Sequence, residues 1–225
     1  MKVTIVPGSA ISQWSYSRYA QWVACPFAAY QKFVLKMKDA SSPAMERGSA
    51  IHKKIEDYLK GTIKTIPIEV DKALHGYYKL LKKEKYQPEL ELAFTTKWEP
   101  TGWFDRNVYV RIKVDALAPD ASVIIDHKTG QPRGGYGDQM QLYGLAGHLL
   151  NPTAAVIRAD LAFTDKGVVV EESFRLRELK KFTKVWDAKV KPMLMDRTFT
   201  PAPSEESCKW CTFKKSRGGP CPVEQ

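Results

Sequence analysis

The sequence contains no long apolar run, and this absence limits where the chain can work. None of its hydrophobic stretches approaches the roughly 20 residues that a membrane-spanning helix needs. The opening residues, MKVTIVPGSA, also lack the apolar stretch of a secretory signal peptide. We therefore expect a cytoplasmic protein that has no membrane partner.

Cysteine and negative charge are also scarce. Only four cysteines occur among 225 residues, and a reducing compartment favours metal ligation or buried thiols over two structural disulfides. The chain has 25 Asp and Glu against 35 Lys and Arg, a net charge of +10. Such an excess suits a polyanionic partner: nucleic acid is the first expectation and an anionic membrane surface the second.

Hydrophobic residues are plentiful, and their pattern predicts an α/β protein. They make up 44% of the chain, ample for a packed core, and no internal repeat or low-complexity linker divides residues 1–225. A single domain is therefore expected. Helical periodicity predicts helices over residues 15–37 with a break at Pro26, from Ser42 to Gly61, and over 71–85, 138–150 and 179–194. Strand patterns cover 90–98, 107–117, 122–128, 161–164 and 168–174.

The segment SVIIDHKTGQ, residues 122–131, combines an apolar strand with three ionisable residues. If the chain turns over residues 119–122, antiparallel pairing places Asp115 directly across from Asp126. Two facing carboxylates repel each other unless a cation lies between them, and Mg²⁺ or Mn²⁺ prefers such oxygen ligands. The segment therefore predicts a divalent metal site.

Strand alternation places Asp126 and Lys128 on one face and turns His127 away. A metal beside an ammonium group suits phosphodiester hydrolysis, because the two together polarise the phosphate and stabilise developing charge. His127 is better placed to offer its backbone carbonyl than its imidazole. An isolated Asp-x-Lys is also typical of a surface salt bridge, so this pattern needs support from the rest of the chain.

That support is an ordered series of short motifs. They are GSAIH (Gly48, His52), ELAF (Glu91), KVDAL (Asp115), IIDHK (Asp126, Lys128) and QMQLY (Gln139, Tyr143). With CPFAAY before them and a C-terminal group of cysteines after them, this order resembles the PD-(D/E)XK nucleases over nearly the whole chain. The match is to the RecB-like branch that carries an iron–sulfur cluster, including CRISPR adaptation nucleases and phage exonucleases. The resemblance implies a restriction-endonuclease-like core, a central mixed β-sheet flanked by helices.

The resemblance also implies a set of site residues. The catalytic metal, Mg²⁺ or Mn²⁺, would be bound by His52, Asp115, Asp126 and the backbone carbonyl of His127. Lys128 would be the catalytic lysine, and Glu91 a supporting acid that binds a second metal or orients a water. Gln139 and Tyr143 lie on one helical face and would position the substrate or the lysine. The alternatives are a core histidine for His52 and ordinary helix residues for Gln139 and Tyr143.

Two positions depart from the family pattern. Ile112 stands where the family usually has glycine, three residues before the first metal-binding aspartate. His127 stands where the family commonly has tyrosine, within its Asp-x-Lys motif. Neither change removes a side chain that must touch metal, but the second places a titratable ring beside the site.

The cysteine spacing favours a metal centre. Cys208-x-x-Cys211 can hold one metal, Cys221 follows after nine residues, and Cys25 lies far away in the sequence. The resemblance implies that all four bind a 4Fe-4S cluster, in a subdomain built from residues 15–37 and 200–225. Structural zinc is the alternative, because four thiolates serve both.

The function implied by the resemblance is metal-dependent DNA cleavage. We expect an exonuclease acting on single-stranded DNA or DNA ends in recombination, repair or phage DNA processing, in a bacterial cytosol or an infected host cell. Its partners would be a single-strand annealing protein, a recombinase or a helicase. The alternative is a non-catalytic DNA-binding recombination accessory protein that retains the nuclease fold.

Side chains that would contact DNA are also expected. For phosphate they are Lys53, Lys54, Arg133 and Lys214; for stacking on unpaired bases they are Tyr16, Tyr19, Trp22 and Tyr136. Core packing is the alternative role of the aromatic residues.

Overall fold

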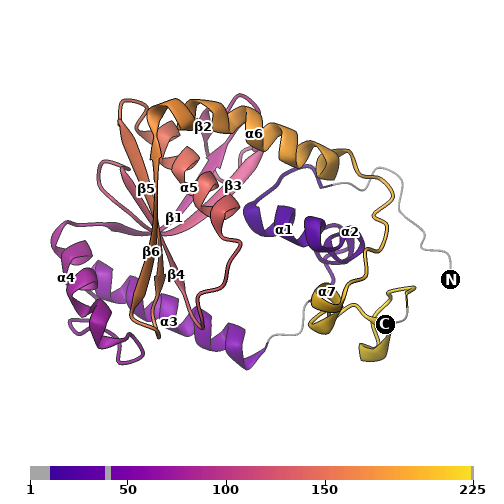
Figure 1. The fold of residues 1–225 in the computed structure, drawn as a ribbon, viewed down its shortest axis with the longest axis horizontal. Helices are drawn as coiled ribbons and strands as arrows, with labels where there is room; N and C mark the ends of the chain where they lie inside the picture. The colour runs from indigo at the N-terminus through magenta and orange to yellow at the C-terminus, as the bar shows by residue number, and fades with distance from the viewer. Residues whose placement is uncertain (1–10, 39–41, 224–225) are drawn as a thin grey trace. The chain divides into compact units, whose positions relative to one another are not determined.

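The computed structural model describes residues 11–38 and 42–223, which form two compact units (Figure 1). The core unit consists of residues 42–185. The terminal unit combines the two ends of the chain, of which the structure describes residues 11–38 and 186–223. Within the described ranges, no helix has both the length and the apolar character that a membrane crossing requires.

The core unit is built on a six-stranded mixed sheet with the strand order β2-β1-β3-β4-β5-β6. Its strands are β1 (Gln87–Phe94), β2 (Pro100–Thr101), β3 (Val110–Leu117), β4 (Val123–Lys128), β5 (Val156–Phe163) and β6 (Val168–Arg175). Strands β4 and β5 are parallel, and the other neighbouring pairs are antiparallel. The expected α/β fold with a mixed sheet flanked by helices is confirmed.

Helices cover both faces of this sheet (Figure 1). On one face, α3 (Pro43–Lys60) and α4 (His75–Lys83) share a buried apolar cluster with Ile125 of β4. On the other, α5 (Gly137–Leu150) packs so closely that a Cβ added at Gly147 would lie 3.6 Å from Ile124. Because neighbouring strand residues face opposite sides, Asp126 falls on the α5 side and His127 on the side of α3 and α4.

Local sequence signals explain the bounds of α3. The Ser42 side chain accepts a hydrogen bond from the Met45 N–H, and Pro43 occupies the first turn, where its missing N–H costs nothing. The helix ends at Gly61, whose φ of 82° is the left-handed conformation that glycine adopts without strain. The predicted start and end of this helix are both confirmed.

The predicted helix over residues 71–85 is shorter in the structure. A 3₁₀ turn, η2 (Lys72–Leu74), leads into α4, which ends at Lys83. The Asp71 side chain caps the turn by accepting from the Ala73 N–H.

Three strand predictions were wrong at their ends. The first predicted strand, 90–98, is β1 over 87–94, because a tight turn from Thr95 to Glu99 reverses the chain toward β2. The second, 107–117, begins only at Val110. The fourth, 161–164, begins at Val156 instead. Its early half contains Arg158 and Asp160, which pair with each other at 2.8 Å and so allow charged residues within a central strand.

The terminal unit contains short helices from both ends of the chain. They are α1 (Tyr16–Ala24), α2 (Pro26–Ala29), the π-helical η1 (Tyr30–Val34), the end of α6 (Leu176–Met195), α7 (Glu205–Lys209) and the 3₁₀ turn η3 (Lys215–Arg217). Cys25 is extended between α1 and α2, which confirms the predicted break at Pro26. Trp186 is fully buried and stacks on Trp14 with ring centroids 5.3 Å apart.

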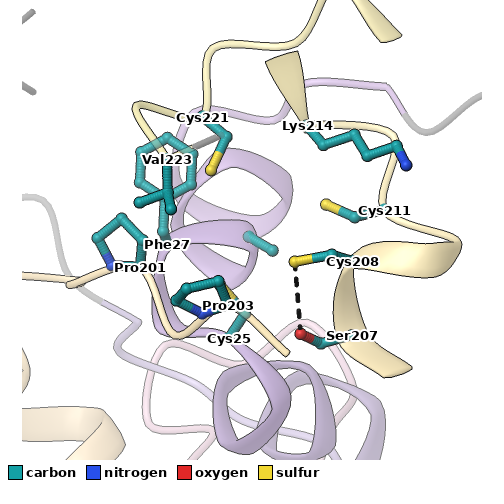
Figure 2. Close-up of a pocket in the computed structure, with 11 residues that line it drawn as sticks. Cys25, Phe27, Pro201, Pro203, Ser207, Cys208, Cys211, Lys214, Cys221 and Val223 are labelled. Atoms are coloured by element: carbon teal, nitrogen blue, oxygen red, sulfur yellow. Dashed lines mark hydrogen bonds between the residues drawn. The ribbon is translucent and has the colours of Figure 1, made fainter. Parts of the chain in front are cut away.

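A pocket in the terminal unit brings the four cysteines to one place (Figure 2). Cys25 comes from the α1–α2 junction, and Cys208, Cys211 and Cys221 come from the C-terminal segment. The other lining residues are Phe27, Ala28, Pro201, Pro203, Ser207, Lys214 and Val223. Residues almost two hundred positions apart therefore surround a single space.

Candidate metal and catalytic site

Three neighbouring strands of the core unit carry carboxylates at one level. The pairs Pro88↔Ala116 and Leu90↔Val114 bracket Glu89 and place it opposite Asp115. The pairs Ala116↔Ile125 and Leu117↔Ile124 set the register of β3 and β4, and one further step places Asp115 opposite Asp126. The predicted register of this pair of strands is confirmed in the two recorded pairs.

The ladder between β3 and β4 stops just before the acids. Beyond Ala116 and Ile125, the backbone N–H of His127 donates to the Asp115 side chain, with N to Oδ2 at 2.6 Å. The same oxygen lies 3.3 Å from Nδ1 of His52. Asp115 therefore replaces a strand-to-strand bond at the point where the strands separate, and it connects the sheet to α3.

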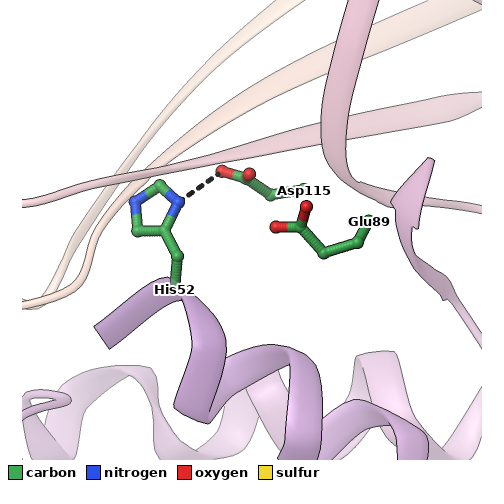
Figure 3. Close-up of side chains that lie close together, drawn as sticks. All are labelled: His52, Glu89 and Asp115. Carbon is green, nitrogen blue, oxygen red and sulfur yellow. Dashed lines mark ion pairs between the residues drawn. The ribbon is translucent and has the colours of Figure 1, made fainter. Parts of the chain in front are cut away.

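His52, Glu89 and Asp115 form a compact group of potential metal ligands (Figure 3). Their ligand atoms all lie within 4.8 Å of one another, and they come from α3, β1 and β3. One imidazole and two carboxylates form a donor set that fits a divalent cation with a preference for oxygen and nitrogen ligands. Glu89 has a backbone φ of 55°, which is uncommon for a residue other than glycine.

The structure does not bring Glu91 into this group. Its side chain is exposed, and its partner across the ladder is Lys113. Glu89, two residues earlier in the same ELEL segment, lies in the group instead and forms an ion pair with Lys113 at 2.7 Å. Sequence reasoning overlooked Glu89 because the two glutamates look alike. Only the register between β1 and β3 distinguishes them, and the long connection between these strands, residues 95–109, does not fix that register in the sequence.

Asp126 belongs to a second, adjoining set of contacts. The Lys128 ammonium lies 2.7 Å from its Oδ2 and donates to Oε1 of Gln139 at 3.1 Å. The Tyr143 hydroxyl donates to Asp126 Oδ1 at 2.5 Å, and the Gln139 amide donates to the same oxygen at 3.2 Å. Gln139 and Tyr143 of α5 thus fix both the acid and the lysine. Asp126 is close to the compact ligand group but is not one of its three members.

The pKa values of Asp115 and Asp126 shift in opposite directions. Burial disfavours the charge of Asp115, but the hydrogen bond from His52 and the nearby imidazoles outweigh burial and lower its pKa to about 2. Burial raises the pKa of Asp126 against the opposing pull of Lys128, and the negative charge of Asp115 raises it further. A cation between the strands would relieve that repulsion, so the acid pair itself favours a positively charged ligand.

His52 is biased toward its charged form. Burial lowers its pKa, but the hydrogen bond to Asp115, together with the charges of Asp115, Asp126 and Glu89, outweighs burial and raises the pKa above its usual value. Three carboxylates near one imidazole are a strongly negative environment. A divalent cation would replace the proton there and neutralise the same charges.

His127 falls on the face of β4 opposite to Asp126, as strand alternation predicts. Its ring is buried, Nδ1 lies 3.2 Å from the Tyr78 hydroxyl, and the ring contacts His52 edge-on with centroids 5.7 Å apart. Nε2 has no hydrogen-bond partner among the described residues. Burial lowers its pKa to about 4, so the ring is neutral at neutral pH. The role of its carbonyl as a metal ligand stays a prediction.

The other departure from the family pattern has no visible effect on the strand. Ile112 is buried in a regular part of β3 and pairs with Leu92 of β1. Gly48, one turn before His52, approaches the end of β4 so closely that an added Cβ would lie 3.3 Å from Oγ1 of Thr129. The small residue lets α3 bring His52 to the strand ends.

Most residues expected to contact DNA have partners within the protein. Lys53 pairs with Glu56 and Asp57, and Lys54 pairs with Glu69. Tyr16 and Tyr19 contact the Trp186 ring, the Trp22 indole donates to Asp196, and Tyr136 packs edge-on against Phe163. These contacts agree with the packing role that was the alternative for the aromatic residues.

The four cysteine sulfurs are spread around their pocket. The Ala202 N–H donates to Cys25 Sγ at 3.5 Å, and the Ser207 hydroxyl lies 3.8 Å from Cys208 Sγ. Burial raises the pKa of Cys211, and the neighbouring sulfurs of Cys25, Cys208 and Cys221 raise it further. In the described part of the chain, no three cysteine sulfurs lie within 4.8 Å of one another.

Comparison with known proteins supplies the family context. The PD-(D/E)XK nuclease superfamily matches this chain over residues 13–216. Among solved structures, SSO0001 is 16% identical to this chain with a TM-score of 0.49. The match covers 95% of this chain and 88% of the SSO0001 chain. LHK-Exo in complex with dAMP is 12% identical with a TM-score of 0.40. That match covers 82% of this chain and 90% of the LHK-Exo chain. No curated protein matches the chain.

Proposed function

This chain belongs to the PD-(D/E)XK nuclease superfamily, and from that premise we propose that it hydrolyses phosphodiester bonds in DNA with a divalent metal ion. The observation that carries the proposal is the arrangement at the ends of β1, β3 and β4. Glu89 and Asp115 meet His52 there, and Asp126 lies beside them in contact with Lys128. Acids, imidazole and ammonium in one place match the requirements of phosphoryl chemistry.

His52, Glu89 and Asp115 would hold the metal, with Asp126 and the His127 carbonyl completing its ligands. When bound, a divalent cation polarises the scissile phosphate and lowers the pKa of a water molecule. Glu89 would be the acid contributed by the first core strand, the strand on which the resemblance implied Glu91. The imidazole of His52 makes Mn²⁺ a better fit than Mg²⁺, because Mg²⁺ favours oxygen ligands more strictly.

Lys128 would act on the reacting groups directly. Asp126 and Gln139 hold its ammonium at 2.7 and 3.1 Å, so it can donate to a phosphate oxygen or orient a water without first being ordered. The Tyr143 hydroxyl holds Asp126 from the other side. Gln139 and Tyr143 are therefore positioning residues in this proposal.

The form of the substrate is a finer proposal. We infer an exonuclease of the RecB-like branch, acting on single-stranded DNA or DNA ends in recombination, repair or phage DNA processing. The motif series and the net charge of +10 support it. A single-strand annealing protein, a recombinase or a helicase would supply such DNA, in a bacterial cytosol or an infected host cell.

We also propose that the terminal unit holds a 4Fe-4S cluster through its four cysteines. A zinc ion with four thiolates at about 2.3 Å brings the sulfurs to within about 3.8 Å of one another. No described cysteine trio is that compact, since none fits within 4.8 Å. A cluster of four irons separates its thiolates more widely and suits a pocket that the sulfurs surround.

The test of the proposed activity is incubation with end-labelled single-stranded and double-stranded DNA. Each DNA is mixed with wild-type protein or Asp126→Ala in Mn²⁺, in Mg²⁺ or in EDTA. We expect degradation by the wild type in metal only, and none by the variant. Equal background in all samples would contradict the nuclease. DNA binding without cleavage would favour the non-catalytic accessory protein.

A further inference from the structure

The loop from Cys208 to Cys221 in the terminal unit has an unusual composition. Its cations are Lys209, Lys214, Lys215 and Arg217, and no acidic residue occurs between Ser207 and Val223. It also contains two aromatic residues with opposite environments. Phe213 is buried at 4% exposure, whereas Trp210 is 73% exposed. The loop thus presents one large aromatic surface among positive charges.

This exposure is not the result of a loosely folded loop. The Cys221 N–H donates to the Phe213 carbonyl at 3.0 Å, and Gly219 lies so close to Phe213 that an added Cβ would meet its backbone at 2.2 Å. Arg217 donates to the Lys209 carbonyl at 3.1 Å. A loop closed by these contacts holds Trp210 outward in a defined position.

Cationic side chains flank the indole. The Lys209 ammonium lies 5.6 Å from the centre of the Trp210 ring, and the contact from Arg217 to the Lys209 carbonyl brings a guanidinium to the same part of the loop. An aromatic face beside positive charges is the combination with which proteins bind unpaired nucleic-acid strands, through base stacking and phosphate contacts.

We propose that this loop is a binding site for an unpaired stretch of DNA, with Trp210 stacking on a base and Lys209 and Arg217 contacting phosphates. The inference rests on the proposed function for the identity of the nucleic acid, and adds where and in which form the strand is bound. Unpaired DNA is favoured over duplex because the bases of a duplex already stack on one another.

An anionic membrane is a weaker match to the same surface. Membrane-surface segments bury a broad apolar face. Within this loop, all of which the structure describes, Trp210 is the one exposed large apolar side chain. A single indole between cations offers a base-sized contact with charge on either side.

The test measures binding apart from cleavage. Full-length Asp126→Ala protein is titrated against fluorescein-labelled oligothymidine and against a hairpin duplex, with affinity read by fluorescence anisotropy. Adding Trp210→Ala should weaken oligothymidine binding roughly 5- to 100-fold, the usual range for one lost base stack. Trp210→Phe should restore most of the loss. Duplex binding should change less than about twofold.

Lys209→Gln with Arg217→Gln should lower the salt dependence of oligothymidine binding by about 0.7 per lost phosphate contact, measured as the slope of log affinity against log salt. Ile68→Ala is the matched control. Ile68 is 94% exposed in the core unit beside Glu69, and its removal should leave binding unchanged.

Two results would overturn the inference. One is oligothymidine binding by Trp210→Ala, with a circular dichroism spectrum like that of its parent, at the parent's affinity. The other is Trp210-dependent binding to phosphatidylserine vesicles while oligothymidine binding is unaffected. Neither result touches the proposed nuclease, which is judged by whether protein with the native Asp126 cleaves DNA in metal.

Discussion

Glu89 shows how a single residue can be placed by backbone geometry. Its φ of 55° would cost free energy in an ordinary strand, yet it lies opposite Asp115 and within the compact ligand group. Glu91 lies two residues on in the same strand with an exposed side chain. The pair therefore offers a matched comparison within one segment.

We predict that Glu89→Gln weakens Mn²⁺ binding by at least about tenfold. Residues that only hydrogen-bond to a metal ligand already cost about 10- to 100-fold in affinity when mutated, and a ligand itself should cost no less. Glu91→Gln should change it less than about twofold. Isothermal titration calorimetry of each variant measures the affinity. Equal losses in the two variants would remove Glu89 from the site.

His127 makes stability depend on pH. Its folded pKa of about 4 lies below the usual 6.5 or so, because the buried site favours the neutral ring. The fold is therefore more stable where the ring is neutral in both the folded and the unfolded chain. The contribution is fully present above pH 6.5 or so and is lost as the pH falls toward 4. It amounts to about 3 kcal/mol.

We predict that His127→Asn removes most of this loss between pH 7.5 and pH 5, as measured by urea unfolding in EDTA. His52 has the opposite sign, because its raised pKa adds stability at low pH that is lost as the pH rises. The contribution of His52 is the same in the wild type and in His127→Asn, so it cancels in the difference between their stabilities. The same acid dependence in both proteins would contradict a buried neutral His127.

At the scale of elements, α5 is the helix whose Gln139 and Tyr143 contact Asp126 and Lys128. Its Gly144 has no room for a side chain, since an added Cβ would lie 2.4 Å from the Phe174 ring of β6. Gly137, at the start of the same helix, has nothing within 4 Å of an added Cβ. The two glycines therefore lie in the same helix but differ in the room available for a side chain.

We predict that Gly144→Ala lowers the free energy of unfolding by about 1–3 kcal/mol, because α5 must shift off the sheet. Cleavage should fall as well, since Gln139 and Tyr143 move with the helix. Gly137→Ala should be neutral or stabilising by up to about 1 kcal/mol. Urea unfolding and the DNA cleavage rate measure the two effects, and a neutral Gly144→Ala would contradict the close packing.

Several elements were predictable because their signals are local. Ser42, Pro43 and Gly61 bound α3, Pro26 separates α1 from α2, and the alternation in VRIKVDAL identifies β3. The register that faces Asp115 with Asp126 also followed from the turn between the strands. Local chemistry of caps and turns does not depend on the rest of the fold.

Other features depended on distant residues and could not be predicted. The start of β5 was missed because two charged residues lie within it. Arg158 forms an ion pair with Asp160, and the Tyr77 hydroxyl donates a hydrogen bond to Asp160, contacts that exist only in the folded core. The choice of Glu89 over Glu91 required the three-strand register. The spread of the cysteine sulfurs required the folded terminal unit, because spacing alone fits zinc and iron–sulfur ligation equally.

For the whole molecule, the cysteine pocket joins the two ends of the chain into one unit. Thiolates bound to a single centre would hold these segments together more firmly than the short helices do alone. We predict that anaerobically purified protein contains about four irons per chain and absorbs at roughly 400 nm. Cys25→Ser should lose both the iron and the absorption. A colourless protein with one zinc per chain would contradict the cluster.

The central claim is that Lys128 and the acids around it form the catalytic site of a metal-dependent nuclease. The most direct test is Lys128→Met, which removes the ammonium and keeps the length of the side chain. Cleavage of end-labelled DNA in Mn²⁺ should fall at least about 100-fold, while Mn²⁺ affinity by calorimetry stays within about threefold. Lys83→Met, at an exposed position in α4, should cleave like the wild type. Cleavage by Lys128→Met at the wild-type rate would contradict the account.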